Sequence, residues 1–210
     1  MQDNLKHTSI GVVTVTVQER FYTSADLLAM PDDGKRHELE NGELLTMNPP
    51  VLKHVLIGGK LYALLSTEFL RTLANHARQY KLGNVTGSDG GYRLYTDPET
   101  GRETVRVPDV AFVRKEREMK LLNDLYDGAP DLAVEIISPN ETYLAIRRKL
   151  GEYFTYGVRL VWIVYTDEPR IEVFTALNTA VILDIDGVLD GGEVLPGFTL
   201  SVRDLFAVLE

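Results

Sequence analysis

The pattern of hydrophobic and polar positions predicts a chain in which helices and short strands follow one another. Between about Leu52 and Ala77 the apolar residues recur at helical spacing, and Gly58-Gly59 interrupts them, so the predicted helix starts late or is bent. Shorter helical patterns lie at 141–156 and 202–209, and strand patterns lie at 84–94, 104–113, 132–137, 160–166, 170–175 and 180–184. This order of elements indicates an α/β fold with a mixed sheet.

Local signals add detail to the N-terminal part of the chain. Residues 23–28 read Thr-Ser-Ala-Asp-Leu-Leu, the sequence of a short helix capped by its threonine. The strand patterns 37–40 and 43–47 flank Asn41-Gly42, which supplies the positive φ angles of a type I′ turn. We therefore expect a β-hairpin after the short helix. The charged residues 114–128 have a partly helical pattern instead.

Length and patterning favour one domain. At roughly 150 residues per domain, 210 residues fit one generous unit, and no repeat or linker divides them. We predict a single domain over 1–210, in which residues 1–20 form an N-terminal strand or a flexible extension. The longest strongly apolar run, 160–165, is far shorter than the roughly 20 residues of a spanning helix. With no signal-peptide pattern at the N-terminus, we expect a cytoplasmic protein without a membrane partner.

The residue types and motifs present exclude or disfavour several classes of functional site. The chain has no cysteine, which excludes a disulfide framework, a thiolate zinc site and a cysteine nucleophile. None of its four histidines is spaced as in a metalloprotease, and no phosphate-binding loop, dinucleotide-binding glycine pattern or serine nucleophile motif occurs. Carboxylates therefore remain as the obvious metal ligands.

Two acids stand out because they interrupt strands. Asp109 follows Pro108 inside the predicted strand 104–113, and Glu135 is the only charged residue of the apolar run 132–137. A carboxylate in such a run is costly to bury unless it is paired, hydrogen-bonded or bound to a metal. About 18 residues join the two strands, so they can be sheet neighbours whose acids converge at one end. Two carboxylates in that arrangement suit Mg²⁺.

Each of these acids also has a purely structural interpretation. Asp109 can cap a bulge forced by the preceding proline, and Glu135 can pair with Arg106 or Arg147. Lys149 is the third candidate, because a lysine beside a metal-bound water can position the nucleophile and offset charge in the transition state. Tyr153 lies one turn further along the same helix face. The alternative for this lysine is a solvated basic helix face.

The ordered motifs resemble the Uma family of restriction endonucleases, within the PD-(D/E)xK nuclease superfamily. The resemblance runs from about residue 21 to 208. It is carried by the hairpin segment 37–43, Pro49-Pro50 with His54, the segments 108–113 and 134–139, Lys149 with Tyr153, and Gly157-Val158 leading into 161–164.

This resemblance implies a restriction-endonuclease-like core, in which a mixed sheet is flanked by helices, with an N-terminal hairpin and a β-rich C-terminal extension. It implies that Asp109 and Glu135 are the two acids that hold the metal. The superfamily lysine commonly stands at the position of Ile137, but family members place it on the following helix, at Lys149 here. Glu38 corresponds to the family's N-terminal glutamate, a further ligand or a water-orienting base.

One departure concerns Ala145, which stands where the family commonly has an aspartate before the lysine. We expect a Mg²⁺-dependent endodeoxyribonuclease, with Mn²⁺ as a substitute, one or two metal ions, and Glu38, Asp109, Glu135 and Lys149 as catalytic residues. Arg147 and Tyr153 are weaker candidates for substrate binding. The alternatives are a catalytically inactive binding or scaffolding protein of the same fold, and a hydrolase of a small phosphate ester.

The distribution of charge bears on the nucleic-acid partner. The net charge is −9, which disfavours a protein that coats nucleic acid by charge alone. Residues 166–210 hold two basic and nine acidic residues, so most of the excess lies in the C-terminal part, away from every candidate. A locally basic site for DNA is compatible with this distribution. Since cutting both strands of a duplex conveniently uses two sites, we expect a homodimer.

Overall fold

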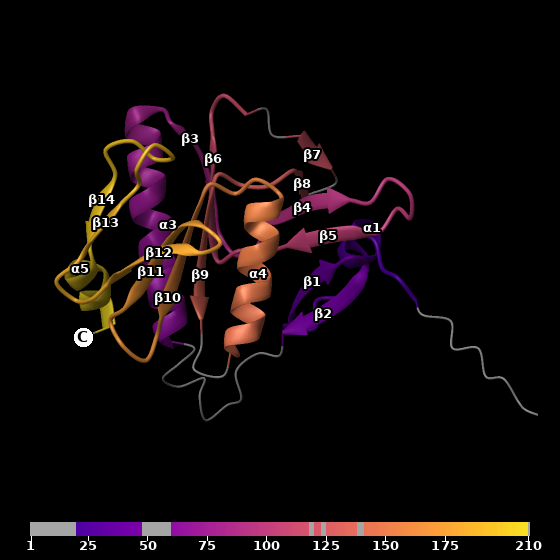
Figure 1. Ribbon diagram of the computed structural model, residues 1–210, viewed down its shortest axis with the longest axis horizontal. Helices are drawn as coiled ribbons and strands as arrows, with labels where there is room; N and C mark the ends of the chain where they lie inside the picture. Colours follow the sequence, from indigo (N-terminus) through magenta and orange to yellow (C-terminus); the bar gives the residue numbers. More distant parts are fainter. Residues whose placement is uncertain (1–19, 48–59, 118–119, 123–124, 138–140, 210) are drawn as a thin grey trace, which may run out of the picture.

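The computed structural model describes residues 20–47, 60–117, 120–122, 125–137 and 141–209. Two mixed sheets lie side by side, with helix α4 (Tyr143–Thr155) close to their junction (Figure 1). Part of the helical pattern 52–77, with Gly58 and Gly59, lies outside the described residues, as do His7, His54 and the N-terminal extension. From Lys60 onward the predicted helix is confirmed as α3 (Lys60–Tyr80), which continues one turn beyond the apolar pattern.

The central sheet holds six strands in the described part of the chain. Their order is β12 (Thr179–Leu183), β11 (Ile171–Ala176), β10 (Leu160–Tyr165), β9 (Leu132–Ile137), β6 (Val110–Arg114) and β3 (Gly83–Thr86). Only the pair of β9 and β10 is parallel among these neighbours, and the other pairs are antiparallel. The mixed sheet expected from the sequence is therefore confirmed.

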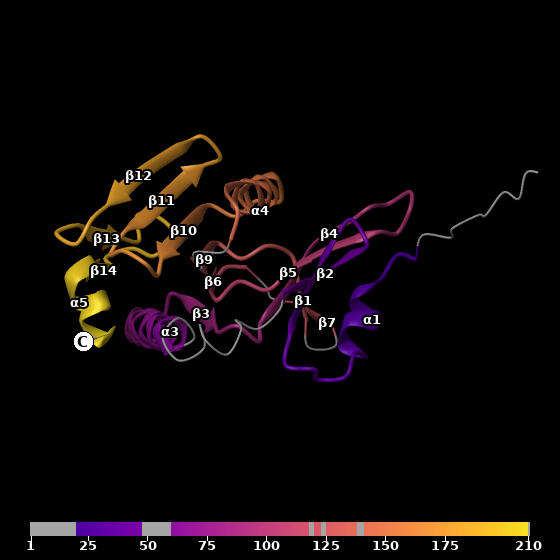
Figure 2. The ribbon, with the colours of Figure 1, turned by 90° about the horizontal axis from the view of Figure 1, so that it is seen from below.

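The two faces of this sheet bury different sets of side chains, as the period-two alternation of strands requires. Val134 and Ile136 of β9 face α3, where they join Phe69 and Trp162 in one apolar cluster. Residues at odd positions of the same strand, such as Ala133, face the cluster around α4. Figure 2 shows α3 and α4 on opposite sides of β9, β6 and β10. Glu135 therefore belongs to the α4 face.

The second sheet carries the predicted hairpin. Its order in the described residues is β2 (Glu43–Met47), β1 (Arg36–Glu40), β5 (Glu103–Arg106), β4 (Gly91–Thr96), β8 (Leu125–Asp127) and β7 (Lys120–Leu122). The hairpin prediction is confirmed, with positive φ angles of 49° at Asn41 and 81° at Gly42. The short helix is also confirmed as α1 (Ser24–Leu28), capped by the Thr23 side chain.

Three strand and helix boundaries differ from the sequence prediction. The predicted strand 84–94 is two strands in different sheets, because a turn closed by the bond from Gly90 N–H to Gly87 O redirects the chain. The predicted strand 104–113 is likewise divided between β5 and β6 at Pro108, which has no N–H to donate. The prediction of partly helical structure over 114–128 is wrong for the described part of this segment, which contains β7 and β8.

The C-terminal part packs on α3 and confirms the β-rich extension. It contains β13 (Val188–Asp190), β14 (Thr199–Ser201), α5 (Val202–Phe206) and a final 3₁₀ turn, η2 (Ala207–Leu209). The predicted terminal helix thus has a tighter last turn than expected. Among the described helices, none has the length and apolar character needed to cross a membrane.

Two glycines give a paired test of this packing. A Cβ at Gly83 would lie 2.0 Å from the backbone oxygen of Val113, so Gly83→Ala forces β3 away from β6. We expect it to lower the free energy of unfolding by about 1–3 kcal/mol. A Cβ at Gly151 of α4 meets nothing within 4 Å, so Gly151→Ala gains about 0.5–1 kcal/mol. Urea denaturation measures both, and a loss of stability in Gly151→Ala would contradict the packing of α4.

Candidate active site

Asp109 and Glu135 meet where the chain passes from the second sheet into the central one. Val110 of β6 lies opposite Val134 of β9, and Asp109 N–H donates to Val134 O at 3.0 Å. This register puts Asp109 in the row of Glu135. The Asp109 Oδ2 atom accepts the backbone N–H of Ile136 at 2.6 Å. The two acids therefore converge at one end of neighbouring strands, as the sequence predicts.

Asp109 is buried, with 2 % of its surface exposed, and its other oxygen has two donors. Oδ1 accepts hydrogen bonds from the Tyr62 hydroxyl, at 2.6 Å, and from Arg36 Nη1. Arg36 also donates through Nη2 to the hydroxyl of Tyr62. Arg36 and Tyr62 are absent from the predicted set. The alternation of β1 contains a signal for the arginine, because Arg36 and Glu38 are two residues apart and share a strand face.

Both side chains that donate hydrogen bonds to Glu135 come from helix α4, one of them charged and the other neutral. Lys149 Nζ donates to Glu135 Oε2 at 2.9 Å, and the Tyr153 hydroxyl donates to Oε1. The lysine and tyrosine are four residues apart, so they lie one above the other on the face that meets β9. Neither suggested pairing of Glu135, with Arg106 or with Arg147, occurs. The Lys149 side chain is 15 % exposed, so it is largely buried and not part of a solvated face.

Glu38 links the hairpin to the same cluster. Its Oε1 atom accepts the backbone N–H of Val107 at 3.0 Å and lies 3.4 Å from Lys149 Nζ. Its Oε2 atom accepts from Arg106 Nη1 at 2.9 Å. Arg106 is 2 % exposed and also pairs with Glu40 and Glu152. Glu38, Lys149, Glu135 and Tyr153 thus form one connected cluster, and Asp109 lies close enough for its charge to act on Glu135 and Lys149.

Burial and mutual repulsion set the proton affinities of this cluster. Burial raises the pKa of Glu135 to about 7; Lys149 opposes this rise, while the negative charges of Asp109 and Glu38 add to it. Burial also favours the neutral form of Glu38, but attraction to Lys149 and Arg106 outweighs it and lowers the pKa of this carboxyl. Glu38 is therefore ionised at neutral pH, whereas Glu135 gains or loses its proton close to neutral pH.

The two hydrogen-bond donors on α4 keep their protons. Burial tends to lower the pKa of Lys149, but the charges of Glu135, Glu38 and Asp109 raise it above its usual range. Burial, followed by repulsion from Glu135, raises the pKa of the Tyr153 hydroxyl well above its usual value. Lys149 is thus a fixed cation and Tyr153 a fixed hydroxyl donor across the physiological pH range.

A hollow of about 250 Å³ opens beside the cluster. Glu38, Glu135, Lys149 and Tyr153 line it on the polar side. Its remaining walls are mostly aliphatic and come from β2, β9, β10 and α4, among them Leu45, Met47, Ile137, Ala145, Ile146, Leu150 and Ile163. Ala145, where the family pattern has an aspartate, therefore faces the site, and so does Ile137 at the usual position of the superfamily lysine.

The donors present fit a hard divalent cation. In the described residues no group of three or more His, Cys, Asp and Glu side chains is arranged to hold a metal. Mg²⁺, however, keeps most of its waters and needs only one or two carboxylates, the number that Asp109 and Glu135 provide. Burial raises the pKa of Glu135, and repulsion from the negative charges of Asp109 and Glu38 adds to this rise. An added cation would relieve that repulsion.

Arg147 and the two described histidines make their contacts away from this cluster. Arg147 donates to Leu177 O at 2.6 Å and to Asn178 Oδ1 at 2.7 Å, because a residue two positions before Lys149 faces about 200° around the helix. His37 contacts Thr46 and Asp33, and His76 contacts Pro196.

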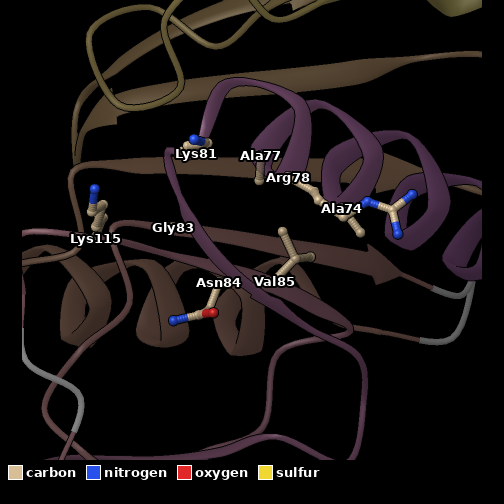
Figure 3. A pocket seen from close by; sticks show the side chains of 8 residues that line it. All are labelled: Ala74, Ala77, Arg78, Lys81, Gly83, Asn84, Val85 and Lys115. Atoms are coloured by element: carbon tan, nitrogen blue, oxygen red, sulfur yellow. The ribbon is translucent and has the colours of Figure 1, made fainter.

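A larger hollow, of about 450 Å³, lies at the C-terminal end of α3. Its described lining includes Arg78, Lys81 and Lys115 but no carboxylate, and these three cations point in different directions (Figure 3). This hollow therefore lacks the ligands of a metal centre.

Comparisons with known proteins identify the family and the fold of the chain. The model of the Uma2 family, described as "Putative restriction endonuclease", matches residues 24–203. A crystal structure from Anabaena variabilis, described as a putative nuclease belonging to DUF820, superposes with a TM-score of 0.68 at 18 % identity. The match covers 89 % of this chain and 98 % of that one, so the two share a fold. No curated protein matches the chain.

The ion pairs of Arg106 with Glu38, Glu40 and Glu152 should contribute to the stability of the fold. Arg106→Met leaves the buried Glu38 without the cation that donates a hydrogen bond to it, so we expect a loss of about 3–5 kcal/mol in the free energy of unfolding. Arg148 also contacts Glu40, at 3.5 Å, but its side chain is 63 % exposed, and Arg148→Met should cost about 1 kcal/mol or less. Chemical denaturation at pH 7 compares the two, and equal losses would refute the role given to Arg106.

Proposed function

Since the chain belongs to the Uma2 family, we propose that it is a metal-dependent nuclease that hydrolyses phosphodiester bonds in DNA. The observation that carries the proposal is the meeting of Asp109, Glu135 and Lys149 at one end of β6 and β9. Two acids and a lysine in this arrangement have the chemistry needed for phosphodiester hydrolysis. The hollow lined by Glu135 and Lys149 gives solvent and substrate a way to reach these two side chains.

Asp109 and Glu135 are the proposed ligands of Mg²⁺, for which Mn²⁺ is the expected substitute. Both carboxylates are held by the sheet, since Asp109 accepts a strand N–H and Glu135 lies within β9. A bound Mg²⁺ polarises the scissile phosphate and lowers the pKa of its water ligand. Tyr153 positions Glu135 through its hydroxyl and does not itself reach the substrate in this proposal.

Lys149 and Glu38 are the residues proposed to hold the attacking water and to stabilise charge on the phosphate. The lysine keeps its proton, so it serves as a hydrogen-bond donor that holds the attacking water and stabilises negative charge on the phosphate. Because Glu38 is ionised and lies 3.4 Å from Lys149 Nζ, it orients the ammonium group and can accept a hydrogen bond from that water. A role of Lys149 as the general base is inconsistent with its raised pKa.

A catalytically inactive binding protein remains the second candidate, favoured by one observation. Ala145 lines the hollow, at the position where the family pattern has an aspartate, so the site holds one acid fewer than that pattern. Nuclease assays on single-stranded, duplex and branched DNA with Mg²⁺ or Mn²⁺ separate the two functions. Cleavage that Lys149→Ala abolishes would reject inactivity. The homodimer, the cytoplasmic location and a substrate contact by Arg147 stay predictions.

Substitution of the acids and of the lysine should separate metal binding from hydrolysis. We expect Asp109→Asn and Glu135→Gln each to weaken Mn²⁺ binding by about 10- to 100-fold in calorimetric titrations. Lys149→Met should lower the cleavage rate at saturating Mn²⁺ by about 100-fold or more, because it removes one charge-stabilising donor. Equal Mn²⁺ affinity in the wild type and both acid variants would refute the assignment of the ligands.

Metal affinity should also depend on pH through Glu135. Its pKa of about 7 means that a proton competes with the metal below neutrality. The dissociation constant for Mn²⁺ should therefore rise by up to about tenfold for each pH unit below 7, and level off above 7. Calorimetry between pH 5.5 and 8.5 checks the sign and the position of the break. A dissociation constant that stays level down to pH 5.5 would show that Glu135 is not the titrating ligand.

A further inference from the structure

Arg36 donates a hydrogen bond to one oxygen of Asp109, a proposed ligand of the metal. Oδ1 of Asp109 accepts from Arg36 Nη1 and, at 2.6 Å, from the Tyr62 hydroxyl, while Oδ2 accepts the N–H of Ile136 at 2.6 Å. A carboxylate offers about four lone-pair directions, so three are in use. Both directions on Oδ1 are taken, so coordination of a metal through Oδ1 requires Arg36 or Tyr62 to move.

Among these donors, the guanidinium is the one that a bound cation would displace. The Ile136 N–H belongs to the backbone of β9 and cannot leave without disrupting the strand. The Tyr62 hydroxyl is neutral, and its contact with Asp109 adds no charge beside a cation. Arg36 carries a full positive charge on the same oxygen, where it repels a divalent ion, and its side chain is 24 % exposed at the first residue of β1. A long side chain at this point can swing toward solvent.

We propose that Arg36 is a place-holding cation that exchanges with the metal at Asp109 and, once released, binds an oxygen of the substrate phosphodiester. The inference rests on the proposed nuclease function. Before the exchange the guanidinium neutralises the buried carboxylate, and after it the metal does so. The planar guanidinium then has its donors free for a phosphate, which it matches in geometry. Metal binding thereby prepares the site for its anionic substrate.

A purely structural Arg36 would behave differently. In that case the arginine only ties β1 to the central sheet, and its removal loosens Asp109 and weakens metal binding. If it is a place-holder, its removal abolishes a competitor and strengthens metal binding. The sign of the change in metal affinity therefore decides between the two roles, without any measurement of cleavage.

The test titrates Mn²⁺ into the full chain, without nucleic acid, and compares the wild type with Arg36→Gln. Loss of the competing charge should lower the dissociation constant by about 5- to 150-fold, the range of coupling between two bound groups. Arg93→Gln is the matched control, because Arg93 is 23 % exposed, pairs with the largely buried Glu103 and changes the net charge equally. It should bind Mn²⁺ like the wild type. Unchanged or weaker binding in Arg36→Gln overturns the proposal.

Two further comparisons keep the proposal testable if Arg36→Gln folds poorly. Arg36→Lys keeps the competing charge, so its Mn²⁺ affinity should stay near that of the wild type. Its KM for an oligonucleotide should rise, because an ammonium cannot make the paired contact with phosphate. Tighter Mn²⁺ binding or an unchanged KM in Arg36→Lys would overturn the place-holding or the phosphate role, respectively.

Failure of this inference is distinguishable from failure of the proposed function. If Asp109→Asn weakens Mn²⁺ binding while Arg36→Gln leaves it unchanged, the metal site stands and only the place-holding role is wrong. If Asp109→Asn binds Mn²⁺ like the wild type, the metal site itself is wrong, and the exchange proposed for Arg36 falls with it.

Discussion

Burial of three neighbouring carboxylates is the constraint on which the rest of this structure depends. Glu38, Asp109 and Glu135 are each nearly inaccessible to solvent, and a buried carboxylate is tolerated only with a cation or strong donors beside it. Arg36 and Arg106 supply two of these cations from the second sheet, and α4 supplies the third. The site is therefore complete only where hairpin, central sheet and helix meet, so its ion pairs fix how those three parts pack.

Much of this arrangement could be predicted from local sequence. A single acid in an apolar strand, Glu135, must have a partner, and the helix after the strand offers Lys149 and Tyr153 one turn apart. Those features need only strand alternation and helix geometry. The contacts of Asp109 could not be predicted in the same way, because Arg36 and Tyr62 lie 73 and 47 residues away and reach it only through the packing of two other elements.

The strand boundaries failed for a related reason. Periodicity shows that residues are extended, but it does not show which sheet they join. The segments predicted as 84–94 and 104–113 are continuous in pattern, and yet each passes from one sheet to the other. The second passage runs through Val107, Pro108 and Asp109. Val107 gives its N–H to Glu38 while Asp109 gives its N–H to β9, so the passage itself assembles the site.

The place of Glu135 in β9 also constrains how the chain can misfold. Strand β9 is apolar on both faces, so hydrophobic burial alone distinguishes poorly between the native strand and one displaced by a single residue. A displaced strand would carry this carboxylate to the α3 side, where Val134 and Ile136 pack with Phe69 and Trp162 in the native fold. The free-energy cost of burying a carboxylate among apolar side chains disfavours this displaced strand. Glu135, the proposed metal ligand, thus also contributes to the uniqueness of the native fold, and its neutral replacement would weaken that uniqueness.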